Sequence, residues 1–103
     1  MVCLIISDIH GNADALLAVL ADAKKHGDVE KILCLGDIAG YAAEPDVCIS
    51  IARELGFTSV KGNHDLAVSG EMNTREFNAD AAEAAAWQKA HIDVADRRWL
   101  KMP

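Results

Sequence analysis

Three short apolar runs divide the first two thirds of the chain, at residues 2–6, 32–35 and 57–60. Runs of this length that are rich in branched residues are typical of strands buried on both faces of a parallel sheet. Between the runs, apolar residues recur at intervals of three and four, the spacing of one buried helix face. The pattern therefore predicts strand, helix, strand, helix, strand, which is an α/β fold with a βαβαβ parallel half-sheet and flanking helices.

End signals set the bounds of the two helices between the strands. The first is expected from Ala13 to about His26, with Asn12 as its N-cap and Gly27 after its end. The second is expected to begin at Pro45, a favoured first helical residue, and to end before Gly56. The polar residues between the first helix and the second strand predict a connection rather than strand.

The last third of the chain has a different pattern. Residues 66–77 have no periodicity and predict a loop that is mobile or depends on a partner. A helix is expected to start at Asn78 or Asp80 and to include the alanine-rich residues 81–90. A second short helix is expected at roughly 94–101. Residues 1–103 are thus interpreted as one domain.

That domain is expected to be incomplete. Apolar strands in a parallel sheet need cover on both faces. The two crossover helices could protect one face, but the alanine-rich helix, which is expected to bury little besides Trp87, is a thin cover for the other. We therefore expect the chain to form the front half of a larger unit or to pair with another chain, as a homo-oligomer or with a second polypeptide.

Composition narrows the class of protein. The net charge is −6, with 16 acidic against 10 basic residues, which disfavours broad attraction to nucleic acid or anionic lipid. No apolar run approaches the roughly 20 residues needed to cross a bilayer, and no secretory signal is visible, so a cytoplasmic protein is expected. Cys3, Cys34 and Cys48 lie within apolar runs and are expected to be buried, reduced thiols.

Polar side chains follow each predicted strand: Asp8 and His10 after the first, Asp37 after the second, and Asn63 and His64 after the third. Right-handed crossovers bring all three strand ends to one edge of the sheet, where open α/β sheets bind ligands. Asp8 and His10 should project to the same side if the chain stays extended. Each motif alone could be a structural turn, but their repetition favours a site.

Carboxylate, amide and imidazole ligands suit a borderline divalent ion such as Mn, Fe, Co, Ni or Zn. Asp37, on the central motif, is the natural candidate to bridge two ions. Two ions about 3.5 to 4 Å apart can hold a phosphoryl group and activate a water. His64 could then donate to a phosphate oxygen or protonate the leaving oxygen. The residues therefore predict a metal-dependent reaction at phosphorus.

These motifs carry a resemblance to a known family. Asp8-x-His10, Gly36-Asp37 and Gly62-Asn63-His64-Asp65 resemble the first three motifs of the calcineurin-like metallophosphoesterases, and their flanks resemble the small bacterial members. The resemblance implies the first half of a four-layer α/β/β/α fold that hydrolyses a phosphomonoester or phosphodiester with two divalent ions, Mn by family precedent. The substrate would be a small phosphate ester.

The resemblance also implies a role for each matching residue. Asp8 and His10 would bind the first metal ion, Asp37 would bridge, and Asn63 would bind the second. Asn63 and His64 would contact substrate, His64 would assist catalysis, and Asp65 would orient it.

The family's later histidine motifs have no match in this sequence, because His26 and His91 lack the required neighbours. The missing ligands could come from a separate polypeptide or from further sequence in a longer protein, and the isolated chain could be inactive. The alternative is a noncatalytic interaction module, or a truncated pseudoenzyme that retains the half-fold. Tyr41 and residues 69–75 are candidate substrate contacts, for which a structural role is the simpler interpretation.

Overall fold

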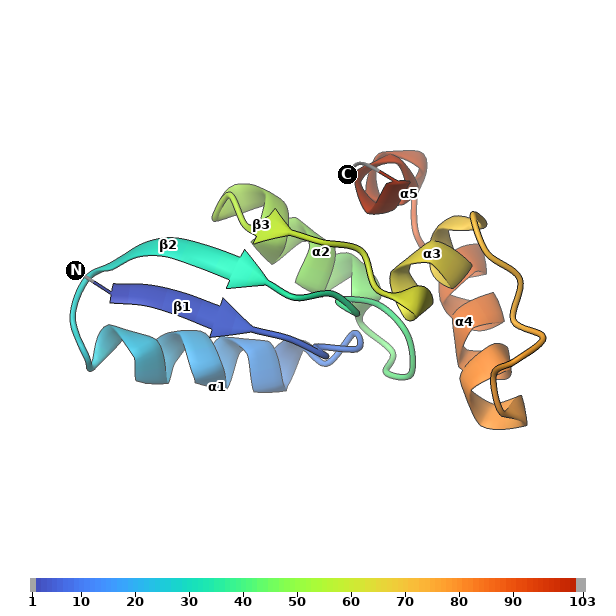
Figure 1. Cartoon of the computed structure of the whole chain (residues 1–103), viewed down its shortest axis with the longest axis horizontal. Coiled ribbons are helices and arrows are strands. Elements are labelled where there is room, and N and C mark those ends of the chain that lie inside the picture. The colour runs from blue at the N-terminus through green and yellow to red at the C-terminus, as the bar shows by residue number, and fades with distance from the viewer. Residues whose placement is uncertain (1, 102–103) are drawn as a thin grey trace.

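A three-stranded parallel sheet forms the centre of the computed structural model, which describes residues 2–101. Its strands are β1 (Val2–Ile6), β2 (Val29–Cys34) and β3 (Thr58–Ser59), in the order β1-β2-β3 (Figure 1). β1 and β2 pair from one end to the other, with one irregularity between Val2 and Cys3, whereas β3 pairs with β2 at two positions only. The predicted α/β half-sheet is confirmed.

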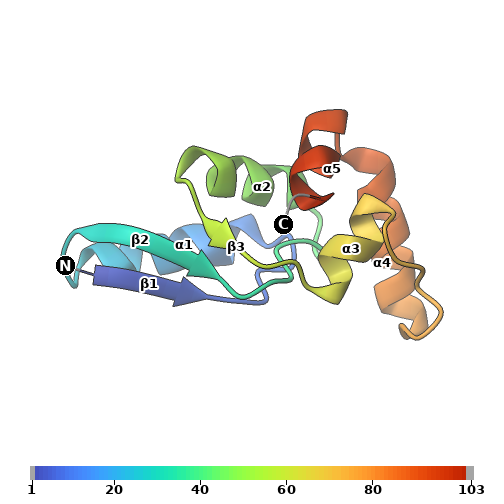
Figure 2. The ribbon, with the colours of Figure 1, turned by 45° about the horizontal axis from the view of Figure 1, so that its top comes forward.

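The two crossover helices, α1 (Ala13–Lys24) and α2 (Pro45–Glu54), cover the same face of the sheet (Figure 2). The Asn12 side chain caps α1 by accepting a hydrogen bond from the Ala15 N–H at 3.0 Å, as predicted. Pro45 is the first residue of α2, also as predicted. Their apolar faces meet the sheet in a core that includes Leu16, Ile32 and Ile49.

Three boundaries differ from the prediction. α1 ends at Lys24, two residues early. β2 starts at Val29, because the backbone there pairs with Val2 and continues the sheet despite its polar side chains. β3 is shorter than its apolar run because only residues opposite Leu33 and Cys34 pair with β2.

The predicted loop after residue 65 was partly wrong, because the chain forms a short helix, α3 (Asn63–Ser69), directly after β3. The motif residues that open α3 are polar, so the helix has no run of apolar spacing to reveal it. Gly62 is its N-cap, and Gly70 ends it with a left-handed φ of +89°. The third strand therefore ends in a helix start instead of a free loop.

The last two helices, α4 (Ala79–His91) and α5 (Val94–Lys101), pack against α3 beyond the carboxyl ends of the strands (Figure 1). The Asn78 side chain caps α4, accepting from the Ala81 N–H at 2.8 Å. Trp87 was expected to supply the buried area of α4, but 44% of it is exposed. The buried residues of α4 are Ala81, Ala85 and Gln88, whose small or polar side chains allow a close approach.

The second face of the sheet is left open by all five helices of the described region. Ile5, Leu35 and Val60 are 59 to 60% exposed. Cys3 of β1 is also exposed, contrary to the prediction, whereas Cys34 and Cys48 are buried. The reason is the alternation of β1, whose second and fourth residues point away from the helices.

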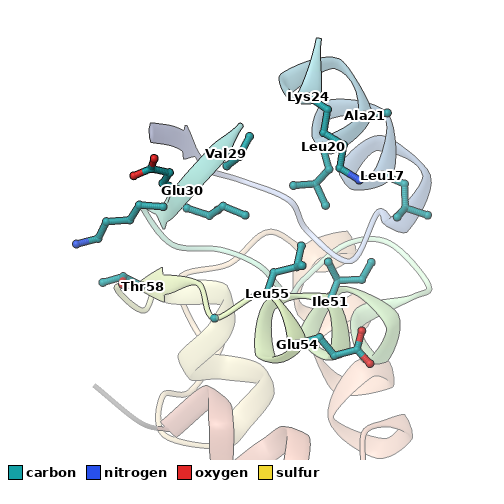
Figure 3. A pocket seen from close by; sticks show the side chains of 13 residues that line it. Leu17, Leu20, Ala21, Lys24, Val29, Glu30, Ile51, Glu54, Leu55 and Thr58 are labelled. Atoms are coloured by element: carbon teal, nitrogen blue, oxygen red, sulfur yellow. The ribbon is translucent and has the colours of Figure 1, made fainter. Parts of the chain in front are cut away.

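An apolar groove of about 700 Å³ separates α1 from α2 on the covered face (Figure 3). Leu17 and Leu20 of α1 face Ile51 of α2 and Leu55, which directly follows α2, across it. None of its lining residues belongs to the three strand-end motifs, so the groove is separate from the predicted chemistry. Within residues 2–101, no helix has both the length and the apolar character to cross a membrane.

Candidate metal centre

Three side chains from two strand ends meet at the carboxyl edge of the sheet. Asp8, His10 and Asp37 each offer a ligand atom within 4.8 Å of the other two. Asp8 Oδ1 lies 3.3 Å from His10 Nε2. The two loops are also tied through their backbones, because the His10 N–H donates to the Asp37 carbonyl at 2.9 Å and the Asp8 N–H to Gly36 at 3.1 Å. The predicted strand topology thus places these residues together.

The backbone does not stay extended here, so the condition under which Asp8 and His10 would project to the same side of a strand is not met. Asp8, His10 and Asp37 all have left-handed backbones, with φ of +57°, +51° and +56°. Asp and His adopt this region more readily than most residues, although at an energetic cost. Such strain gathers at functional sites, where surrounding contacts hold it in place. The side chains converge because these residues have left-handed backbone conformations. The backbone hydrogen bonds between the two loops hold these conformations in place.

The donor set fits a divalent transition metal. His10 Nδ1 lies 3.1 Å from the Ala39 carbonyl, which fixes the ring and leaves Nε2 for a metal. Two carboxylates and one imidazole are typical ligands for Mn, Fe or Zn. Asp8 is largely exposed, so an ion could reach the site without any rearrangement of the core.

The third strand end reaches the same site through Gly62 and His64. The His64 N–H donates to Asp37 Oδ1 at 3.0 Å, and a Cβ on Gly62 would overlap the Asp37 carboxylate. Asn63 lies between these two residues, exposed, as the first residue of α3. Tyr41, 49% exposed, has its ring 4.9 Å from that of His64. His26 and His91 lie elsewhere, beside Asp22 and Trp87.

Asp65 has a different environment from the one predicted. Its buried carboxylate accepts hydrogen bonds from the N–H groups of Asp37 and Ala39, both at 2.8 Å, and of Gly62 at 3.1 Å. Burial raises the pKa of this carboxyl, and the three backbone donors act in the opposite direction. The bonds of Asp65 therefore hold the two loops that carry Asp37 and His64, and none of them reaches the His64 ring.

Gln88 of α4 was missed by the sequence analysis. Its side chain is fully buried, and its Oε1 accepts from the Gly40 N–H at 2.6 Å while its Nε2 donates to the Ala42 carbonyl. A signal was available in the helical spacing. Ala85 comes four residues after Ala81 and Gln88 comes three residues after Ala85, so the three side chains share one face of α4. A glutamine in an alanine-rich helix does not by itself indicate that its side chain binds the backbone of a distant loop.

Comparisons with known proteins identify the family of the chain. The family model for calcineurin-like phosphoesterases matches residues 1–99. An uncharacterized protein of Methanocaldococcus jannaschii is 46% identical over 96 residues, which are 93% of this chain and 39% of that protein. The crystal structure of a metallophosphoesterase from Sphaerobacter thermophilus matches 98% of this chain and 41% of that chain, with 42% identity and a TM-score of 0.78.

A further solved structure, 22% identical with a TM-score of 0.72, has the same fold. The chain spans about two fifths of the length of the relatives that it matches. The match to the first half of the predicted fold is therefore confirmed, and it covers almost every described residue. The chain belongs to the calcineurin-like phosphoesterase family.

Proposed function

We propose that this chain supplies the first part of the active site of a metal-dependent phosphoesterase, which hydrolyses a small phosphomonoester or phosphodiester. The observation that carries the proposal is the convergence of Asp8, His10 and Asp37 within 4.8 Å at the sheet edge. Family membership supports a reaction at a phosphate ester. Activity of the isolated chain is part of what the experiments below test.

Each residue of the site has a proposed role. Asp8 and His10 bind one divalent ion, Asp37 bridges, and Asn63 binds a second. When bound, two such ions, Mn in the first instance, neutralise charge on the phosphoryl group and make a water nucleophilic. His64, with Asn63, contacts the phosphate and donates a proton to the leaving oxygen.

The remaining metal ligands are proposed to come from further polypeptide, either in a longer chain or in a second one. The chain covers 41% of the solved metallophosphoesterase that it resembles, and four side chains are few for two ions. We therefore expect the isolated chain to bind Mn weakly. A cytoplasmic location fits this proposal.

The test is hydrolysis of bis(p-nitrophenyl) phosphate with added Mn, using the chain alone and the chain combined with the remaining polypeptide. We expect turnover that Asp37→Ala abolishes, because the variant removes the shared ligand. Asp14→Asn, an exposed aspartate on α1, is the matched control and should leave the rate unchanged. No turnover with any divalent metal would reject the proposal.

A second candidate function is a noncatalytic interaction module. The exposed apolar residues Ile5, Leu35 and Val60 on the open face favour it. Light scattering of the purified chain, combined with a Mn titration, separates the two candidates. Self-association without metal uptake supports the interaction module, whereas metal-dependent turnover supports the phosphoesterase.

A further inference from the structure

The imidazole of His64 is enclosed by three aromatic rings from separate segments. The ring centroid of Tyr41 lies 4.9 Å away at an interplanar angle of 33°, and that of Phe77 lies 4.6 Å away at 31°. The His10 ring meets it nearly edge-on, at 4.8 Å and 76°. These separations are those of favourable aromatic pairs. The rings therefore limit how far the His64 side chain can turn.

Hydrogen bonding does not account for the orientation of the His64 ring. Its Nδ1 is buried and has no hydrogen-bond partner among residues 2–101. Histidines at metal and catalytic sites are usually oriented by a carboxylate or carbonyl at this nitrogen. Asp65, the carboxylate nearest in sequence, is engaged by three backbone N–H groups instead. The ring must therefore be held by its packing.

Gly40 provides the surface against which this edge of the ring rests. A Cβ at residue 40 would lie 2.5 Å from His64 Nδ1 and 2.8 Å from its Cγ. The position is fixed from behind, because the Gly40 N–H donates to the buried Gln88 side chain. The imidazole thus lies on a rigid backbone surface with its Nδ1 edge turned inward.

The backbone of Tyr41 is held in an unusual conformation beside this ring. Its φ is +59°, in the left-handed region that an aromatic residue rarely adopts because of backbone strain. The next residue anchors it, because the Ala42 N–H donates to the His10 carbonyl at 2.9 Å. The result is a ring within 5.1 Å of His10 as well as beside His64. The loop therefore presents Tyr41 to both histidines of the site.

We propose that Tyr41 and Phe77 are positioning residues, which hold the His64 imidazole by aromatic packing with Nδ1 turned to Gly40 and Nε2 left for the phosphate ester. The packing itself is a property of this chain. Its consequence for catalysis rests on the proposed function, in which His64 protonates the leaving oxygen. The segment that carries Phe77, between α3 and α4, thereby gains a role at the site.

The first experiment is NMR of the 103-residue chain and does not need activity. We expect a nuclear Overhauser contact between the His64 Hε1 and Gly40 Hα protons, which Tyr41→Leu and Phe77→Leu each weaken and the double variant removes. Tyr41→Phe, which keeps the ring, should retain the contact. Trp87→Leu is the matched control, because Trp87 stacks on His91 at 4.0 Å and should change only the His91 resonances.

The second experiment measures kinetics on the completed enzyme with two leaving groups. Loss of general acid catalysis is felt most when the leaving oxygen is basic. We expect Phe77→Leu to lower kcat about tenfold for an alkyl phosphate ester and less than twofold for a p-nitrophenyl ester, with KM and Mn affinity unchanged. Equal losses of kcat for both esters would overturn the proposed effect of Phe77 on proton donation by His64.

An unchanged His64–Gly40 contact in the double variant would overturn the packing itself. If Tyr41→Leu fails to fold, the pair of Tyr41→Phe and Phe77→Leu decides, since the first keeps a ring and the second keeps apolar volume. If the wild-type enzyme has no activity, the proposed function fails. The NMR result alone then supports or rejects the packing of Tyr41 and Phe77 against His64.

Discussion

Asp65→Asn is the variant that tests most directly how this site is held together. The carboxylate is fully buried, and Oδ2 accepts from the N–H groups of Asp37 and Gly62 while Oδ1 accepts from that of Ala39. An asparagine that keeps its oxygen in the Oδ2 position retains two hydrogen bonds, now neutral. Its NH₂ group then faces the Ala39 N–H, so that two donors oppose each other and the backbone group is left unsatisfied.

The expected loss of stability follows from these three bonds. A bond to a charged acceptor contributes about 1.5 to 3 kcal/mol and a neutral one about 0.5 to 1.5, so the two retained bonds lose about 1 kcal/mol each. The unsatisfied buried N–H costs a further 1 to 3 kcal/mol or so. The neutral amide avoids the cost of burying a charged carboxylate, which is the same cost that raises the pKa of the Asp65 carboxyl. This gain offsets part of the lost hydrogen-bond energy. We expect a net loss of about 2 to 3 kcal/mol in the free energy of unfolding.

Urea unfolding of the wild type and the variant, analysed by linear extrapolation, measures the difference. Asp8→Asn is the matched control at the same site, because Asp8 is largely exposed and holds no buried N–H group. It should lose Mn affinity while changing stability by less than about 0.5 kcal/mol. If Asp65→Asn were as stable as the wild type, Asp65 could not be the group that joins the loops of Asp37 and Gly62.

Three further predictions concern other parts of the site and core. Gly62→Ala should weaken Mn binding at least tenfold by calorimetry with little change in helix content, because its φ of −85° suits any residue whereas the added Cβ would overlap the Asp37 carboxylate and crowd the Asp37 backbone nitrogen at 2.8 Å. Gln88→Leu should lower the free energy of unfolding by about 2 kcal/mol, since two loop groups lose their partner. Gln88→Glu keeps the acceptor for Gly40 but sets a buried carboxylate oxygen against the Ala42 carbonyl, so it should lose at least as much in the same assay. Cys3 should react with a maleimide at pH 8 in seconds to minutes, whereas Cys48, whose pKa burial and then Glu44 and Asp46 raise to about 12, should react only on unfolding, as mass spectrometry would show.

The sequence contained enough to predict the order of the three strands and the two crossover helices. Short branched apolar runs and three-and-four spacing signal strands and crossover helices directly, and Asn12 and Pro45 mark helix starts by local chemistry that tertiary structure did not override. Parallel topology then brought Asp8, His10 and Asp37 together. These features depend on local sequence patterns and on the rule that crossovers between parallel strands are right-handed. They can therefore be predicted without knowledge of how the side chains pack.

Other features depend on contacts between distant segments and leave no local pattern. The left-handed backbones of Asp8 and His10 are held by bonds to the loop after β2, which the sequence of either loop does not reveal. The partner of Gly40 is Gln88, 48 residues away. Asp65 follows the histidine motif directly, and its position suggested a role toward His64, whereas its bonds go to backbone groups across the sheet edge.

A set of contacts among residues 2–101 holds the loops of the site, and the relatives that the chain matches are more than twice its length. Backbone bonds join the loops after β1 and β2, Asp65 joins the loop after β2 to the start of α3, and Gln88 holds the outer end of the same loop. Geometry set in this way does not require a cover on the open face of the sheet. Metal affinity, in contrast, depends on the number of ligands, so added polypeptide should raise affinity while leaving the Asp8–His10–Asp37 arrangement as it is.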